Sequence, residues 1–145
     1  MLERQETFSK IREAMTPNVV SVQPDDNLIT AAQTMRENEI GDLLVLEGGE
    51  LYGIVTDRDI VVRAIADGLD PQATAVKDIA STQVKVISPD ADIDDALDIM
   101  REETVRRLPV VEDGRVVGII SLGDLAIQQE PGSALSDISA APPNR

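Results

Sequence analysis

The chain has 145 residues, 42% of them apolar, and its 27 acidic and 13 basic side chains give a formal charge of -14 at pH 7. This charge argues against nucleic acid or a membrane surface as a partner, and no apolar run approaches the length of a bilayer span, so we expect a soluble, cytoplasmic protein. Cys and His are both absent, which excludes disulfides and thiolate or imidazole metal sites and makes catalysis improbable.

A short strand is predicted over residues 19–22. It ends at Pro24-Asp25, where proline stops the strand and aspartate begins a turn. A helix is expected next, because apolar residues recur at the i, i+3, i+4, i+7 spacing of one helix face. The residues predicted to be buried on this face are Leu28, Ala31, Ala32 and Met35.

Two apolar runs follow, separated by Gly48-Gly49. Both central residues accept positive φ angles, so we predict an antiparallel hairpin with a type I′ turn. A second helix is expected to begin after Thr56. Its predicted buried face consists of Ile60, Val61, Ala64 and Ile65.

The same pattern returns 65 residues later without a gap. Pro24-Asp25 aligns with Pro89-Asp90, and Asp59 aligns with Asp124. The other elements of the second copy are a strand over residues 84–87, a helix stripe at Ile93, Ala96, Leu97 and Met100, and a hairpin turn at Asp113-Gly114. One copy of about sixty residues is only marginally stable alone, so we expect the two to pack together.

The repeat divides the chain into five predicted segments. The middle three are the first repeat, a linker and the second repeat, and the two ends are a partly helical N-terminal extension and a flexible C-terminal tail. Their residues are 1–10 for the extension, 11–70 for the first repeat, 71–75 for the linker, 76–130 for the second repeat and 131–145 for the tail.

One motif occurs in both copies: a strand that ends Gly-apolar-apolar-Thr/Ser, then two residues, then Asp at the start of a helix. It spans Gly53 to Asp59 and Gly118 to Asp124. One interpretation is a capping box, which contributes about 1 kcal/mol and needs no ligand. The other is that the carboxylate accepts hydrogen bonds from the diol of a ribose, while nearby arginines bind phosphate. Those arginines are Arg58, Arg106 and Arg107.

These residues resemble paired CBS domains, the Bateman module. The resemblance covers about residues 11–130. It is carried by Met15-Thr16-Pro17, by Arg107-Leu108-Pro109-Val110-Val111 and by the two motifs above. It implies an α+β fold in which two tandem β-α-β-β-α repeats pack as a pseudo-twofold module, as in small stand-alone bacterial CBS-domain proteins.

The resemblance also implies a regulatory adenine-nucleotide site in each of two clefts between the repeats. In each cleft the Thr/Ser and Asp of one copy would hold the ribose, and the base would lie against the other copy. One cleft would use Ser121 and Asp124 with Thr16, Ile40, Gly41 and Asp42. The other would use Thr56 and Asp59 with Val105, Arg106 and Arg107, and Arg58 lies beside Asp59.

We therefore expect a non-enzymatic sensor that binds AMP, ADP, ATP or S-adenosylmethionine, forms a homodimer and signals to a protein partner that the sequence does not name. No catalytic cofactor and no metal is expected. The two clefts need not bind equally, because Gly123 stands where the first copy has Arg58. Two alternatives stay open: a passive dimerisation module in which the motif is only a cap, and carboxylate-based hydrolysis of a nucleotide.

Overall fold

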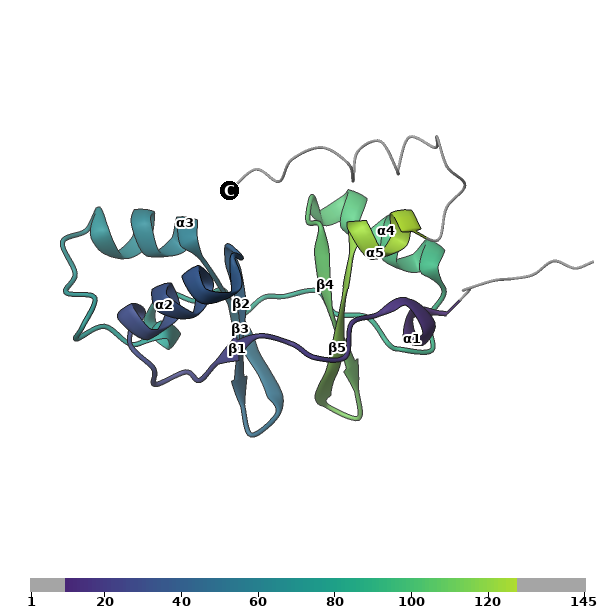
Figure 1. Cartoon of the computed structure of the whole chain (residues 1–145), viewed down its shortest axis with the longest axis horizontal. Helices are drawn as coiled ribbons and strands as arrows, with labels where there is room; N and C mark the ends of the chain where they lie inside the picture. The colour runs from purple at the N-terminus through teal and green to yellow at the C-terminus, as the bar shows by residue number, and fades with distance from the viewer. Residues whose placement is uncertain (1–9, 128–145) are drawn as a thin grey trace, which may run out of the picture. The chain divides into compact units, whose positions relative to one another are not determined.

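The computed structural model describes residues 10–127, and the chain forms two compact units (Figure 1). The first unit consists of residues 19–84, and the described part of the second unit consists of residues 10–18 and 85–127. The N-terminal extension before Lys10 and the predicted tail over residues 131–145 lie outside the described residues.

The first unit is built on a three-stranded sheet with the order β1-β2-β3. Strand β1 pairs parallel with β2, and β2 pairs antiparallel with β3. Two helical segments, α2 and α3 with its continuation η1, lie on the same side of this sheet in Figure 1. The bounds are β1 Ser21–Val22, α2 Leu28–Asn38, β2 Asp42–Glu47, β3 Glu50–Thr56, α3 Asp57–Asp59, η1 Ile60–Ile65 and the 3₁₀ turn η2 Val76–Asp78.

The second unit repeats this plan with a two-stranded antiparallel sheet, β4-β5. Its bounds are α1 Ile11–Ala14, α4 Ile93–Glu103, β4 Arg107–Glu112, β5 Arg115–Ser121 and α5 Leu122–Ile127. The strand predicted over residues 84–87 is wrong except for one parallel bridge between Ile87 and Val110. The cause is Pro109, which occupies the place of Leu44, the β2 residue that pairs with Ser21. Proline has no N–H to donate to a neighbouring strand.

Both hairpins have the predicted type I′ turns. The φ angles are 62° and 87° at Gly48 and Gly49, and 54° and 80° at Asp113 and Gly114. Positive φ at both central residues matches the right-handed twist of the flanking strands. The turns fix the register next to them, and a bulge between Val45 and Leu46, with its equivalent between Val110 and Val111, shifts the pairing by one residue before the far end of each hairpin.

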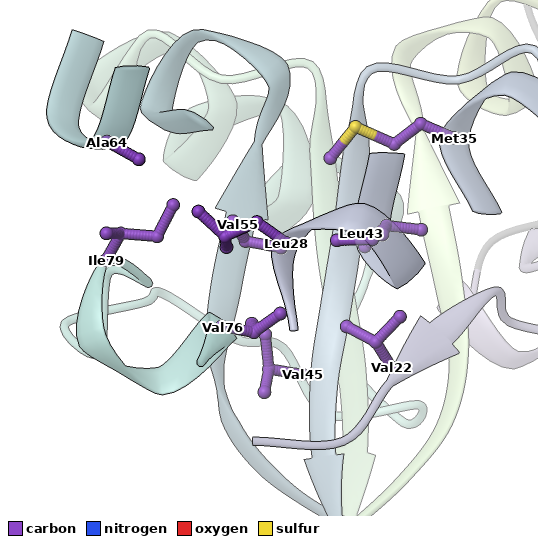
Figure 2. Close-up of a cluster of buried hydrophobic side chains, with 10 residues drawn as sticks. Val22, Leu28, Met35, Leu43, Val45, Val55, Ala64, Val76 and Ile79 are labelled. Atoms are coloured by element: carbon purple, nitrogen blue, oxygen red, sulfur yellow. The ribbon is translucent and has the colours of Figure 1, made fainter. Parts of the chain in front are cut away.

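The apolar core of the first unit confirms most of the predicted helix stripe. Leu28, Ala31 and Met35 of α2 are buried against strand residues such as Val45 and Val55 (Figure 2). Ala32 is exposed, so its predicted burial is wrong. It lines a cavity between α2 and η1 instead of the sheet.

In the second unit, α4 is buried along the corresponding stripe. Ile93, Ala96 and Met100 lie in the core, whereas Leu97 is half-buried. The methionines of both stripes, Met35 and Met100, are core residues as predicted.

The predicted buried face of the second helix of the first repeat is half wrong, although Ile60 is half-buried and packs against the core. Ala64 is buried, but Val61 is 58% exposed and Ile65 is 51% exposed. The helix is wider than an α-helix here, because the N–H of Ala66 donates to the carbonyl of Val61, five residues earlier. Wider turns rotate each side chain away from the 3.6-residue spacing on which the prediction rested.

Each unit is completed by the opening segment of the other repeat. Ile11, before the first repeat's strand, is fully buried in the core of the second unit, and its equivalent Val76 is fully buried in the first. Thr16 exchanges two backbone hydrogen bonds of 2.9 Å with Ile119. Ser81 makes the equivalent pair with Ile54, at 2.8 and 2.9 Å. The compact unit and the sequence repeat therefore do not coincide.

Candidate functional site

The repeated motif forms a reciprocal cap at the end of the last strand in both units. The N–H of Asp59 donates to Thr56 Oγ1, and the N–H of Thr56 donates to Asp59 Oδ2, both at 3.0 Å. Asp124 and Ser121 make the same pair at 3.0 and 3.1 Å. The cap is therefore present twice, and it holds each carboxylate beside the hydroxyl of the Thr or Ser.

Each cap uses only one oxygen of its carboxylate. Asp59 Oδ1 lies 4.0 Å from Arg63 Nη1, and the Asp59 side chain is 19% exposed. Within residues 10–127, the Oδ1 atom of Asp124 has no hydrogen bond, and neither has that of Asp59. An ionised carboxylate oxygen accepts more than one hydrogen bond, so each Oδ1 keeps the capacity to accept from hydroxyl groups.

The loop before each hairpin lies against the motif of its own unit. The carbonyl of Gly41 accepts from the N–H of Asp57 at 2.9 Å. Asp42, the next residue, pairs across the sheet with Thr56. The predicted residues Ile40, Gly41 and Asp42 are thus held near Thr56 and Asp59.

The second unit has the same arrangement. The carbonyl of Arg106 accepts from the N–H of Leu122 at 2.8 Å, and Arg107 pairs across the sheet with Ser121. The preceding residue, Val105, is 39% exposed. The predicted residues Val105, Arg106 and Arg107 are therefore held beside Ser121 and Asp124 of the same unit.

Thr16 lies in the second unit, where its hydrogen bonds to Ile119 place it beside the strand that ends at Ser121. The corresponding residue of the first unit is Ser81, which is bonded to Ile54 on the strand that ends at Thr56. Ser81 is not among the site residues predicted from the sequence. The signal was present, because the 65-residue shift that relates the two copies places Ser81 on Thr16.

Close packing explains why the motif contains a glycine. A Cβ atom at Gly118 would lie 2.9 Å from the carbonyl oxygen of Thr16, and one at Gly53 would overlap the carbonyl oxygen of Ser81. Only glycine lets the exchanged segment approach the strand this closely. This part of the motif is thus explained by packing, and the Thr/Ser and Asp are left as the candidates for ligand contact.

Arg58 and Arg106 are exposed arginines beside the two caps. The backbone N–H of Arg58 donates to Asp57 Oδ1 at 2.7 Å. Within the described part of the chain, neither guanidinium makes an ion pair or a hydrogen bond. Both are therefore available to an anionic ligand.

A cavity of about 440 Å³ opens in the first unit between α2 and the start of η1. Its wall contains Ile40, Gly41 and Asp57, together with the apolar side chains of Ala32 and Ile60. A volume of this size suits a small molecule or an inserted side chain. Thr56 and Asp59 do not line it, so it adjoins the loop of the candidate site without including the cap.

The CBS-domain family model matches residues 11–65 and 76–128, which together include both caps and both loops. The chain belongs to the CBS-domain family. The fold confirms the predicted architecture of two tandem CBS repeats with mixed α and β structure.

The CBS-domain protein YhcV of Bacillus subtilis is 39% identical over 136 residues, which cover 91% of this chain and 96% of YhcV. The crystal structure of Hypoxic Response Protein I with two coordinated zinc ions matches this chain with 36% sequence identity and a TM-score of 0.78. The match covers 84% of this chain and 100% of the chain of Hypoxic Response Protein I. The structure of the hexameric CBS-CP12 protein from bloom-forming cyanobacteria matches with 26% sequence identity and a TM-score of 0.70, over 92% of this chain and 82% of the CBS-CP12 chain.

The sequence contains neither Cys nor His, the usual zinc ligands beside carboxylates. Among residues 10–127, no three acidic side chains are grouped so that they could hold a metal ion. No helix in this same range has the length and apolar character needed to cross a membrane.

Proposed function

We propose that this tandem CBS-domain protein is a non-enzymatic regulator that binds an adenine nucleotide or a related adenosyl compound with residues from both repeats. Tandem CBS domains form regulatory modules that often bind adenine nucleotides. The observation that carries the proposal is the reciprocal cap, which occurs in both units and leaves Oδ1 of Asp59 and of Asp124 without a hydrogen bond among the described residues.

The chemistry of the residues suits the parts of an adenine nucleotide. The Asp carboxylate and the Thr or Ser hydroxyl accept and donate to a ribose diol. Backbone groups can form hydrogen bonds with the adenine base, and the apolar side chains of Ile40 and Val105 can pack against it. Thr16 offers a further hydroxyl for hydrogen bonding. Guanidinium groups suit phosphate, because they present several N–H donors and a fixed positive charge.

A sensor must bind near the concentration of its ligand in the cell. We expect dissociation constants between roughly 1 μM and 1 mM, which correspond to about -8 to -4 kcal/mol. Occupancy becomes a signal only when two conformations of the protein bind the ligand with different affinities. The protein partner that receives this signal is not identified by the residues of the chain.

Isothermal titration calorimetry with AMP, ADP, ATP and S-adenosylmethionine tests the proposal. Asp59→Asn and Asp124→Asn keep an oxygen that accepts the cap hydrogen bond but lose the charge that attracts hydroxyl donors. Each is expected to weaken binding about tenfold or more. Asp95→Asn is the matched control, because Asp95 Oδ2 accepts from the N–H of Asp92 at 3.1 Å in the capping box of α4.

Unchanged binding in both site variants, or an equal loss in Asp95→Asn, would contradict the assignment. The purified protein offers a second test. With one Tyr and no Trp, its own absorbance near 280 nm is weak, so a bound nucleotide would dominate the spectrum at 260 nm. Phosphate release during incubation with ATP would contradict the non-enzymatic part of the proposal.

The second candidate is a dimerisation module without a ligand. It is favoured by an apolar surface formed by Val61, Val62, Ile65 and Leu69, which are between 40% and 58% exposed. We call these four residues the η1 apolar face. Exposed apolar side chains grouped in this way mark interaction sites, and the CBS-CP12 relative is hexameric. Homodimerisation through the η1 apolar face is compatible with either candidate function.

A further inference from the structure

Arg63 contacts two parts of the first unit that are distant in the sequence. Its Nη1 atom donates to the carbonyl of Ile79 at 2.9 Å and lies 4.0 Å from Asp59 Oδ1. Asp59 belongs to the first cap, whereas Ile79 lies in residues 76–81, which open the second repeat and which we call the exchanged segment. One guanidinium therefore lies between the carboxylate of the candidate site and the exchanged segment.

The position of Arg63 concerns the oxygen that is left for a ligand. Asp59 Oδ2 accepts from the N–H of Thr56 at 3.0 Å, so Oδ1 is the atom nearer to the guanidinium. The Asp59 side chain is 19% exposed and the Arg63 side chain is 53% exposed. An ion pair of this length and exposure is weak by itself. The shorter bond to Ile79 fixes the guanidinium, so its charge acts on Oδ1 from a defined direction.

The exchanged segment is bonded to the strand that carries the cap. The N–H of Ser81 donates to the carbonyl of Ile54 at 2.8 Å, and β3 continues from Ile54 to Thr56. Separation of the segment from β3 would break this bond and would also remove the carbonyl that anchors Arg63. The docking of the segment and the surroundings of Asp59 are therefore linked through one side chain.

The first repeat alone has an arginine at this position. A shift of 65 residues places Gln128 on Arg63, and Gln128, which lies outside the described residues, carries no charge. The link is therefore expected in the first unit and not in the second.

We propose that Arg63 is a positioning residue that couples ligand binding at Asp59 to the docking of the exchanged segment on β3. Ligand hydroxyls that donate to Oδ1 fix the carboxylate, the fixed carboxylate orders the guanidinium, and the guanidinium holds the carbonyl of Ile79. Coupling is reciprocal, so a docked segment strengthens ligand binding by the same factor. This inference rests on the proposed function, and it adds the side chain that carries occupancy of the first cap to another part of the unit.

Calorimetry with adenosine and AMP tests the role of Arg63 in binding. The full chain carries Asp124→Asn, which leaves the first cap as the unmodified one. Arg63→Met removes a charge at a half-exposed position and is expected to weaken both compounds about threefold. The two losses should be equal, because Arg63 acts through the carboxylate that binds the ribose, which both compounds contain.

Hydrogen exchange at the Ser81 amide measures the coupling. Saturating AMP should raise the protection of this amide about threefold in the Asp124→Asn chain, and Arg63→Met should abolish the rise. A purely structural role of Arg63 would lower the protection equally with and without AMP. The Ile119 amide, which is bonded to Thr16 in the second unit, is the internal control and should not respond to AMP.

Arg101→Met is the matched control, because it makes the same change in an ion pair of α4, where Arg101 lies 3.1 Å from Asp98. It should leave both affinities and the response of Ser81 unchanged. An Arg63→Met chain that keeps full affinity or keeps the response of Ser81, or that loses more affinity for AMP than for adenosine, would overturn this inference and leave the proposed function standing. Failure of adenosine, AMP and ATP to bind the unmodified chain would overturn both.

Discussion

Lys77 Nζ lies 2.9 Å from Asp25 Oδ1, and the same ion pair, displaced by 65 residues, joins Arg12 to Asp90 at 3.1 Å. Lys77 lies at the start of the second repeat but pairs with the first, and Arg12 lies at the start of the first repeat but pairs with the second. Ion pairing thus follows the same exchange as the buried Ile11 and Val76. The exchange of opening segments between the two repeats therefore involves ion pairs at the surface as well as apolar residues in the core.

The Lys77 pair predicts a dependence of stability on pH. The hydrogen bond and the charge of Asp25 raise the pKa of Lys77 above its ordinary value. A raised pKa in the folded state stabilises the fold at pH values below the unfolded pKa of about 10.4, and this stabilisation is lost as the pH rises through the folded pKa. The unfolding free energy of Lys77→Met should therefore approach that of the unmodified chain between pH 9 and about pH 12.

Urea unfolding across this pH range measures the difference. Lys77→Arg is the control, since arginine stays charged there and Arg12 already occupies the equivalent position. The Lys77→Arg chain should keep its advantage over Lys77→Met at pH 11.5. A constant difference between the unmodified chain and Lys77→Met up to pH 12 would contradict the prediction.

Ile11 tests the exchanged core. It is fully buried in the second unit although it lies at the start of the first repeat, so Ile11→Ala should lower the unfolding free energy by about 3 kcal/mol. Hydrogen exchange should show the loss of protection at the Ile119 amide, which is bonded to Thr16. Val86→Ala, at a side chain 40% exposed, should cost less than about 1 kcal/mol. Comparable losses in the two variants would count against the exchange.

The motif glycines test the close approach of the exchanged segments. Gly118→Ala would place a Cβ 2.7 Å from Met15 Sδ and 2.9 Å from the carbonyl oxygen of Thr16. We expect a destabilisation of about 2 kcal/mol from overpacking, and at least as much for Gly53→Ala, where the carbonyl oxygen of Ser81 is in the way. Thermal unfolding measures both. Full stability in either variant would show that the segment is not packed on the strand.

The η1 apolar face predicts a change in association. Ile65→Glu places a charge on a surface that a homodimer would bury, so sedimentation velocity should show a shift from dimer to monomer at micromolar concentration. Val86→Glu adds the same charge at an exposed apolar residue of the second unit and should leave the dimer intact. A monomeric unmodified chain, or a dimer that Ile65→Glu does not weaken, would refute the assigned surface.

Local features could be predicted because they depend on neighbouring residues. Leu28, Ala31 and Met35 of the first stripe and the turns at Gly48-Gly49 and Asp113-Gly114 are predicted correctly, since helix periodicity and positive φ depend on a few adjacent positions. The errors at Val61 and Ile65 came from a helix with wider turns, which the 3.6-residue spacing does not describe. Pro109 was visible in the sequence, yet its consequence depends on the strand that would lie beside it.

The candidate site was predictable in part for the same reason. Thr56 with Asp59, and Ser121 with Asp124, were found because the cap is a local pattern that occurs twice. The placement of Arg106 and Arg107 against the second cap depends on strand pairing between residues fourteen apart. Ser81 was missed because nothing near it in sequence indicates that it lies against Ile54.

The sequence alone determined that this protein contains two copies of one repeat, each with a cap and a hairpin. It also determined which charged side chains stand near each cap in the sequence, because these features depend on composition and short-range spacing. Tertiary structure decided which segment completes which unit. Ile11 and Val76 are both apolar and occupy equivalent positions, so hydrophobicity alone does not assign either residue to one core. Only the path of the chain in space, through the hydrogen bonds of Thr16 and Ser81, assigns each to the unit of the other repeat.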